Sequence, residues 1–206
     1  EQKIIDLFAG VGGLSLGAAR AGFNVVGAIE LDDHAIATHT KNFPSTRHIQ
    51  KNIHNLTAEE ICEDLKISKG ELSGVIGGPP CQDFSSAGDR TEGERANLTV
   101  SYAKIIKSIK PKYFVMENVS RAKMSKAYAE AREIFVSAGY GLTELVLDAS
   151  KCGVPQKRKR FFCVGALNEP DDFLKKNLLA NQSVISLSVR NYFTQNHYQL
   201  NIDYYY

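Results

Sequence analysis

The sequence lacks the features that mark membrane and exported proteins. In its 206 residues no apolar run approaches the roughly 18 residues that a transmembrane helix needs. The N-terminus has no basic segment followed by an apolar one, so we expect no signal peptide. Hydrophobic residues make up 43% and charged residues 23%, which is ordinary for a soluble globular protein. We therefore expect one domain or a little more, in the cytoplasm.

Cysteine and histidine are too scattered for the usual metal sites. The four cysteines include no C-x-x-C pair, and the five histidines include no H-E-x-x-H pattern. These absences argue against a structural zinc site, a disulfide framework and a metal hydrolase, and they favour a reducing cytosol. We expect no bound metal.

Charge is small in total but uneven along the chain. The formal net charge is +2, yet residues 1–80 are net acidic and residues 81–206 are net basic, with the densest basic run over 157–160. A basic half suits a polyanionic partner. A solvated basic surface is the simpler explanation when charge is taken alone.

Strand and helix patterns alternate along most of the chain. A polar stretch over 82–97 has no period and indicates a functional loop, and no clean period appears from about 168 on. The alternation predicts an α/β fold, an open and mostly parallel sheet with helices on both faces. Expected strands cover 3–8, 24–29, 47–49, 74–76, 113–116, 142–147 and 160–164, and expected helices cover 14–21, 32–42, 57–65, 98–109 and 125–138.

The stretch DLFAGVGG, residues 6–13, lies between the first expected strand and helix. Its glycines allow a tight turn and close approach of a ligand, and a helix N-terminus adds unpaired N–H donors. Ser15 stands where a dinucleotide fingerprint needs its third glycine, which disfavours an NAD oxidoreductase. Glu30 ends the second strand, where a carboxylate can accept ribose hydroxyls. The pattern indicates an adenosine-containing cofactor, with a plain capped turn as the alternative.

The stretch GGPPCQDFS, residues 77–85, ends a short buried strand. Pro79 and Pro80 each fix φ near −65°, so Cys81 would follow a rigid turn. A lone cysteine is usually packed as a small hydrophobe. The double proline and the long polar loop after it favour a reactive thiol instead.

Two further stretches place charged groups at strand ends. MENV, residues 116–119, puts Glu117 at the sheet edge expected for Cys81, where a poorly solvated carboxyl can stay protonated and grip a ring nitrogen. QKRKR, residues 156–160, would point Gln156, Arg158 and Arg160 to one face of a strand. Paired arginines suit phosphate or a base carbonyl. A cap and a charged edge strand are the respective alternatives.

Taken together and in this order, the four stretches resemble the cytosine-5 DNA methyltransferase family over about residues 3 to 166. DLFAGVGG resembles its first cofactor motif, GGPPCQDFS its nucleophile motif, ENV its glutamate motif, and GVPQKRKR its Q-x-R-x-R motif. The resemblance implies the Rossmann-like fold of S-adenosylmethionine-dependent methyltransferases. It also implies methyl transfer from S-adenosylmethionine to carbon 5 of cytosine in DNA, with S-adenosylhomocysteine as product.

The resemblance also implies roles for individual residues. Cys81 would attack carbon 6 of a flipped-out cytosine, Glu117 would hold its N3 and amino edge, and Arg158 and Arg160 would contact the base or its backbone. The family's cofactor contacts fall on Asp6, Phe8, Gly10, Gly12, Gly13, Glu30, Leu31, Asn52, Ile53 and Pro79, and its DNA contacts on Gln82, Ser85 and Gln156.

Two departures concern the cofactor contacts. Asn52, in KNIHNL, stands where the family commonly has the aspartate of GDI. Leu31 follows Glu30 where an aromatic partner is sometimes seen.

The domain organisation follows from the same resemblance. Residues 1–166 would form the catalytic domain, and 167–206 a linker with the truncated start of a target-recognition region. We expect double-stranded DNA as partner, and a second subunit or a missing C-terminal segment for target recognition, so that this chain alone methylates little. A bacterial, nucleoid-associated role beside a restriction enzyme fits. The alternatives are an RNA (tRNA) cytosine-5 methyltransferase and a non-catalytic subunit that keeps the fold.

Overall fold

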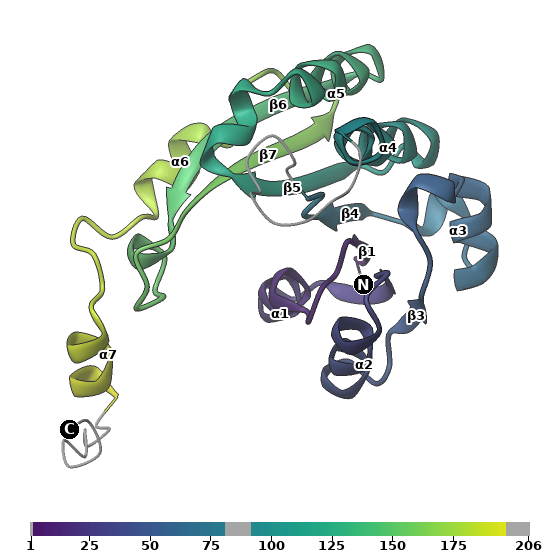
Figure 1. The fold of residues 1–206 in the computed structure, drawn as a ribbon. Coiled ribbons are helices and arrows are strands. Elements are labelled where there is room, and N and C mark those ends of the chain that lie inside the picture. The colour runs from purple at the N-terminus through teal and green to yellow at the C-terminus, as the bar shows by residue number, and fades with distance from the viewer. Residues whose placement is uncertain (1, 81–91, 197–206) are drawn as a thin grey trace.

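The computed structural model describes residues 2–80 and 92–196, and its centre is a seven-stranded sheet (Figure 1). The strand order is β3-β2-β1-β4-β5-β7-β6. The first five strands along the chain pair in parallel, while β7 runs antiparallel to both β5 and β6. The predicted α/β class with a mostly parallel sheet is confirmed. The strands are β1 (Lys3–Leu7), β2 (Asn24–Ile29), β3 (Arg47–Ile49), β4 (Gly74–Gly77), β5 (Tyr113–Val119), β6 (Tyr140–Asp148) and β7 (Lys159–Leu167).

Helices cover both faces of this sheet. One face carries α1 and α2, and the other carries α3, α4 and α5 (Figure 1). The α-helices are α1 (Gly13–Arg20), α2 (Asp33–Asn42), α3 (Ala58–Leu65), α4 (Glu92–Ile109), α5 (Lys126–Ser137), α6 (Lys175–Ala180) and α7 (Val189–Gln195). Short 3-10 turns are η1 (Ile53–Asn55), η2 (Lys69–Glu71), η3 (Ser120–Met124) and η4 (Ala149–Lys151).

Local chemistry explains where several helices begin. Asp32 caps α2 by accepting the backbone N–H of Ala35 at 2.8 Å. Thr57 and Glu60 form the capping box that their spacing predicts, each side chain accepting the other's backbone N–H. These caps fix the residues at which α2 and α3 begin.

The main core lies between the sheet and helices α3 to α5. Ile5 and Leu7 of β1 point into it and are fully buried, as are Phe114 of β5 and Phe135 of α5, whose ring centroids lie 4.2 Å apart. Burying one such side chain stabilises the fold by about 1.5–3 kcal/mol. Because strand residues alternate, Asp6 of β1 faces the opposite side, toward α1.

The structure extends or shortens some expected elements. Helix α4 starts at Glu92 rather than at 98. Residues 92–97 are helical although they precede the apolar period on which the prediction rested. Strand β5 runs on through Val119, so Glu117 pairs with Phe162 inside the sheet. The loop expected over 82–97 therefore ends earlier, and residues 81–91 lie outside the described part of the chain.

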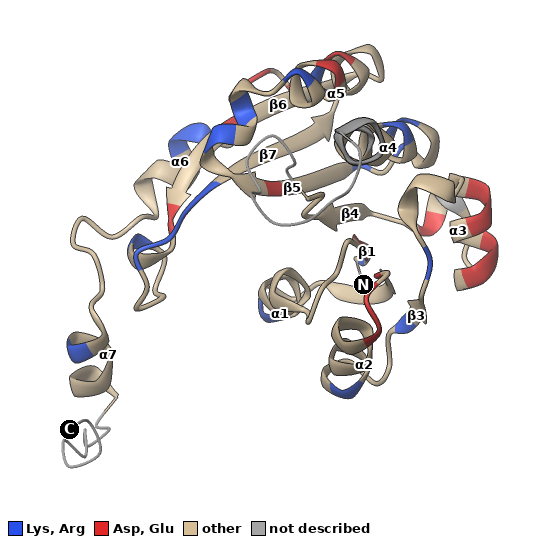
Figure 2. Ribbon diagram, viewed as in Figure 1, with Lys and Arg blue, Asp and Glu red and all other residues tan. Residues whose placement is uncertain are grey.

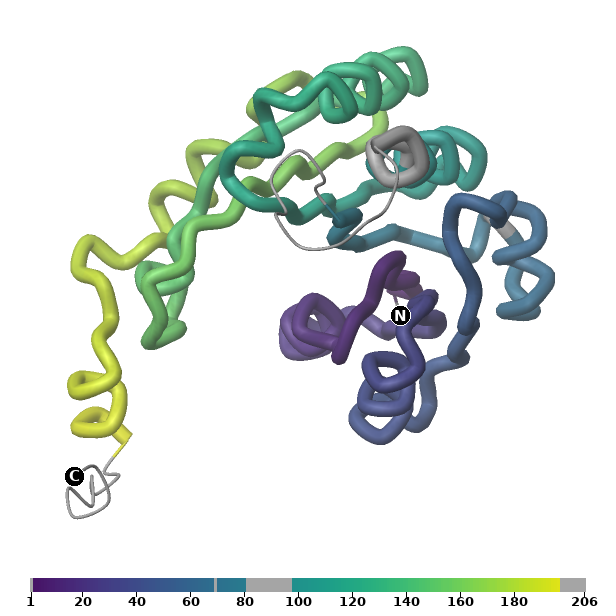
Figure 3. The backbone as a smooth tube through the Cα atoms, in the orientation of Figure 1, coloured from purple at the N-terminus to yellow at the C-terminus, as the bar shows by residue number. Residues whose placement is uncertain are grey.

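After β7 the chain leaves the sheet and continues through α6 to α7, the last helix of the described residues (Figure 3). Two backbone hydrogen bonds connect the stretch between α6 and α7 to η4. The Ser183 N–H donates to the Lys151 carbonyl at 2.8 Å, and the Leu187 N–H donates to the Ser150 carbonyl at 2.7 Å. In the described ranges, no helix has the length and apolarity required to cross a membrane.

Candidate active site

The turn after β1 has an unusual backbone. Phe8, Gly10 and Gly12 have φ values of 64°, 54° and 100°. Left-handed φ in a non-glycine residue such as Phe8 costs on the order of 1–3 kcal/mol and is typical of functional sites. A Cβ on Gly12 would lie 2.6 Å from Cε2 of Phe43, the C-cap residue of α2. Glycine is therefore required where the turn packs on α2, and the turn takes its shape from that packing.

The Glu30 carboxylate holds this turn against the end of β2. Its Oε2 accepts the Gly10 N–H at 2.8 Å, and its Oε1 accepts the N–H groups of Leu31 at 2.8 Å and Asp32 at 2.9 Å. An ionised carboxylate has about four acceptor positions. Three are used, so one remains for a ligand hydroxyl. The predicted contact with both ribose hydroxyls would have to share that position.

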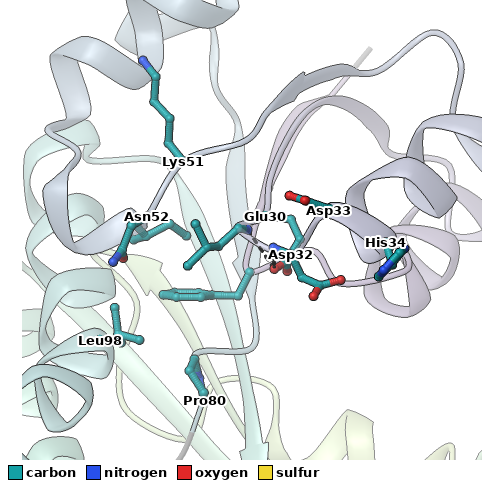
Figure 4. Close-up of a pocket in the computed structure, with 11 residues that line it drawn as sticks. Glu30, Asp32, Asp33, His34, Lys51, Asn52, Pro80 and Leu98 are labelled. Carbon is teal, nitrogen blue, oxygen red and sulfur yellow. Dashed lines mark hydrogen bonds between the residues drawn. The ribbon is translucent and has the colours of Figure 1, made fainter. Parts of the chain in front are cut away.

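A first cavity of about 590 Å³ opens beside Glu30 (Figure 4). Apolar side chains and carboxylates share its wall, which fits a nucleoside with a flat apolar base and a hydroxylated sugar. Pro79, predicted to contact the cofactor, is buried, and its neighbour Pro80 lines the cavity in its place. The lining residues are Phe8, Glu30, Leu31, Asp32, Asp33, His34, Lys51, Asn52, Ile53, Pro80 and Leu98.

Asn52, predicted to stand where the family has an aspartate, lies in this wall. Its Oδ1 accepts the His54 N–H at 3.0 Å and so caps η1. The amide nitrogen, which donates, and the second lone pair of Oδ1 are left for a ligand. Adenine offers acceptor ring nitrogens, so Asn52 can still meet the base, though not as a carboxylate would.

A second cavity, also about 590 Å³, shares Phe8 with the first. The turn contributes Gly10 and Gly13, and the far wall contains Glu117, Arg158 and Arg160. A ligand in one cavity can thus approach a ligand in the other past the Phe8 ring. The remaining lining residues are Ala9, Val11, Leu14, Gly78, Leu147, Ala149, Cys152, Val154 and Phe162.

Glu117 is the acidic group of the second cavity. Burial raises the pKa of its carboxyl, and the guanidinium groups of Arg160 and Arg158 partly offset that rise. Arg160 Nε lies 3.0 Å from Glu117 Oε1. The ion pair fixes one carboxyl oxygen and leaves Oε2 toward the cavity. The raised pKa makes this carboxyl easier to protonate than an exposed glutamate, as a proton donor to a ring nitrogen requires.

The segment that leads to Cys81 passes directly over this carboxyl. A Cβ on Gly78 would lie 3.2 Å from Glu117 Oε2, so the backbone approaches this carboxyl closely. Asn118 Nδ2 donates to the Pro79 carbonyl at 3.0 Å, and Asn118 Oδ1 accepts the Val119 N–H at 2.8 Å. The last described residues before Cys81 are therefore fixed against Glu117.

Some predicted site residues lie elsewhere. Cys81, Gln82 and Ser85 fall outside the described residues. Asp6 is fully buried, and neither Asp6 nor Gly12 lines a cavity.

The prediction that Gln156 shares a strand face with Arg158 and Arg160 is wrong. Strand β7 begins only at Lys159, so Gln156 precedes it, exposed in the connection from β6. Arg158 also precedes the strand, yet it still reaches the second cavity together with Arg160.

Sequence reasoning did not single out several residues of the two cavities, Cys152 and Phe162 among them, nor the adjacent Asn118. Asn118 adjoins Glu117 in the ENV stretch, and that adjacency was the available signal. Cys152 is exposed and lines the second cavity, and nothing near it in the sequence indicates this.

Charge is distributed unevenly around the site. Lysine and arginine gather at the start of β7 and in the connection before it, whereas acidic residues gather on α3 (Figure 2). The basic edge adjoins the second cavity through Arg158 and Arg160. Within 2–80 and 92–196, no group of three His, Cys, Asp or Glu side chains is placed to hold a metal ion.

Over residues 2–206 the sequence matches the family model of C-5 cytosine-specific DNA methylases. The chain belongs to this family. It is 46% identical over 209 residues to the type II methyltransferase M.HgiDI of Herpetosiphon aurantiacus, covering 100% of this chain and 64% of the relative. It is 44% identical over 206 residues to M.HindV of Haemophilus influenzae, covering 100% and 65%. The chain thus spans just under two thirds of these relatives.

Solved structures agree with the fold. A prophage-encoded protein of E. coli superposes with a TM-score of 0.76 at 35% identity, over 93% of this chain and 54% of that one. The DNMT2 protein of Spodoptera frugiperda superposes with a TM-score of 0.69 at 25% identity, over 82% and 51%.

Proposed function

We propose that this chain is the catalytic part of an enzyme that transfers a methyl group from S-adenosylmethionine to carbon 5 of cytosine in DNA. The observation that carries the proposal is the contact between Glu117 and the Gly78–Pro80 segment, which leads directly to Cys81. The contact lies in a cavity that adjoins a nucleoside-sized one through Phe8. Family membership supports the same chemistry.

The first cavity suits the cofactor. Glu30 would accept a ribose hydroxyl with its free acceptor position, and Phe8, Leu31 and Ile53 would enclose the adenine. The amide nitrogen of Asn52 would donate to the base. When bound, S-adenosylmethionine supplies an electrophilic methyl group.

The second cavity suits a cytosine turned out of the duplex, which costs a few kcal/mol of lost stacking and pairing. The Cys81 thiolate would add to carbon 6, forming a sulfur–carbon bond and moving an electron pair toward carbon 5. Glu117 would carry the proton that N3 shares, making the ring a better electron acceptor. Once carbon 5 is methylated, loss of its proton and departure of the thiolate restore the aromatic ring. Arg160 would keep the Glu117 carboxyl in place.

The proposal is tested by the product of methyl transfer. Labelled S-adenosylmethionine is incubated with the chain and with DNA or tRNA, and the nucleosides are identified by mass spectrometry. We expect 5-methylcytosine in DNA, at a low rate, because the chain spans under two thirds of its relatives. Glu117→Gln should lose this product, and the exposed Glu133→Gln on α5 should retain it. Label in tRNA alone would identify an RNA enzyme, and label on adenine would contradict the proposal.

A further inference from the structure

A line of four polar side chains runs beneath the turn after β1. Ser15 Oγ lies 2.6 Å from Asp6 Oδ2, His39 Nε2 lies 3.1 Å from Ser15 Oγ, and His48 Nε2 lies 2.9 Å from His39 Nδ1. The four residues come from β1, α1, α2 and β3. Asp6, Ser15 and His39 are fully buried, and His48 is half-buried. The line therefore connects the interior to the surface.

The donors and acceptors in this line depend on one another. A serine hydroxyl carries one hydrogen, and a neutral imidazole has one N–H and one acceptor nitrogen. If Ser15 donates to an ionised Asp6, it must accept from His39 Nε2–H, and His39 Nδ1 must then accept from His48 Nε2–H. If Asp6 is protonated and donates to Ser15, every bond reverses and both rings carry their proton on Nδ1. The protonation state of Asp6 thus sets both tautomers.

We propose that Asp6, Ser15, His39 and His48 form a proton-sharing relay that supports the turn and carries one proton between the surface and Asp6. The proton enters at the half-buried His48 ring, on Nδ1, the ring nitrogen that does not face His39. The His48 Nε2 proton passes to His39 Nδ1, the His39 Nε2 proton passes to Ser15 Oγ, and the Ser15 hydroxyl proton passes to Asp6 Oδ2. One proton has then moved from water to Asp6, and both rings remain neutral.

The environment of each group agrees with neutral rings and a titrating carboxyl. Burial raises the pKa of Asp6 to about 7, Glu30 raises it further, and the hydrogen bonds from Ser15 lower it. Burial lowers the pKa of both histidines. His48 lowers the pKa of His39 further, whereas Glu30 acts to raise it. A hydrogen bond with the Thr46 backbone acts to raise the pKa of His48. The Tyr102 hydroxyl also interacts electrostatically with Asp6. Among the described residues, Asp6 Oδ1 has no hydrogen-bond partner. An unpartnered, buried oxygen favours the neutral, protonated form of the carboxyl.

The relay also acts on the turn itself. His39 Cδ2 would lie 3.1 Å from a Cβ on Gly12, so the ring packs directly under the left-handed part of the turn. Ser15 and His39 are therefore positioning residues for the cofactor site. This consequence rests on the proposed function. Ionised Asp6 places a negative charge under that site and should favour the cationic S-adenosylmethionine over S-adenosylhomocysteine.

Nitrogen-15 NMR of the histidine rings tests the relay without any cofactor. Between pH 5.5 and 9, we expect His39 and His48 to stay neutral and to change tautomer together in one step near pH 7. Ser15→Ala and Asp6→Asn should each abolish the step, and Ser137→Ala, which removes an exposed hydroxyl on α5, should leave it unchanged. If one variant fails to fold, the other decides.

Fixed tautomers over the whole range, an imidazolium at the step, or an unchanged step in the folded Ser15→Ala protein would overturn the relay. Calorimetric titration gives the second readout. The affinity ratio of S-adenosylmethionine to S-adenosylhomocysteine should rise roughly threefold from pH 6 to pH 8.5, and not in Asp6→Asn. Absence of binding by either compound would contradict the proposed function and leave the NMR result to decide the relay.

Discussion

Replacing Glu30 by glutamine should weaken cofactor binding more than any other single amide substitution on the surface of the first cavity. The Glu30 carboxylate accepts three backbone N–H groups, two on Oε1 and one on Oε2. Glutamine keeps one oxygen. Its NH₂ group would then face the Gly10 N–H, so that two donors meet where a hydrogen bond existed. The turn after β1 would lose its attachment to the end of β2.

The size of this effect follows from the hydrogen bond that is lost. A hydrogen bond to a charged group contributes about 1.5–3 kcal/mol. Because about 1.4 kcal/mol corresponds to a factor of ten in affinity, the dissociation constant for S-adenosylhomocysteine should rise roughly 10- to 100-fold. If the amide is turned the other way, two N–H groups lose their acceptor and the loss is at least as large.

Isothermal titration calorimetry on the purified chain measures this change. Glu133→Gln is the matched control, because it makes the same substitution at an exposed position of α5 that lines neither cavity. The control should bind within about twofold of the unmodified chain. Equal affinities for Glu30→Gln and the unmodified chain, or an equal loss in both variants, would refute the role given to Glu30.

Three other substitutions give separate tests. Gly12→Ala should destabilise the fold by about 1–3 kcal/mol in urea denaturation, because its Cβ would collide at positive φ with side chains at the C-terminal end of α2. The control Gly13→Ala places its Cβ in open space and should not destabilise the fold, so equal effects would refute the packing argument. Asn118→Asp keeps an acceptor but cannot donate to the Pro79 carbonyl. The rate of methyl transfer should therefore fall at least about tenfold while cofactor affinity stays unchanged. An unchanged rate of methyl transfer would exclude this positioning role. Asp6→Asn should gain stability relative to the unmodified chain as pH rises from 5 to 8, and a pH-independent difference would contradict the buried titration.

The sign of the last effect follows from linkage. The pKa of Asp6 is raised from 3.8 to about 7, so the folded protein binds the proton more tightly than the unfolded chain. The stability that this proton provides is complete below pH 3.8 and is lost as pH rises to about 7. At 1.36 kcal/mol per pKa unit, the loss amounts to at most ~4 kcal/mol. Asparagine does not titrate, so it avoids this loss.

Much of the fold could be predicted because its elements have local causes. Apolar runs separated by glycine and proline mark the parallel strands, and the Thr57 capping box marks the start of α3. The start of α4 could not be found this way, since residues 92–97 add helical backbone without adding apolar period. Strand β7 lies antiparallel between β5 and β6, an arrangement set by tertiary packing that no local pattern in RFFCV indicates.

The site was predictable where one stretch of sequence carries a whole function. Glu30 lines the first cavity, and Glu117 and Arg160 line the second, while the roles given to them stay predictions. Contacts between distant elements were not predictable, because they depend on packing. The packing of Gly12 against the C-terminal end of α2 is an example, because neither sequence contains a pattern that indicates this contact. The prediction for Gln156 failed because it applied strand alternation to residues that precede Lys159, where β7 begins.

The central claim is that Cys81 forms a covalent bond to cytosine beside Glu117. It is tested most directly by incubating the chain with S-adenosylmethionine and DNA that contains 5-fluorocytosine, whose fluorine cannot leave as the proton does. Denaturing mass spectrometry should find a protein–DNA adduct, and peptide mapping should place it on Cys81. A chain that binds both DNA and cofactor but forms no adduct, or an adduct on Cys152, would contradict the account.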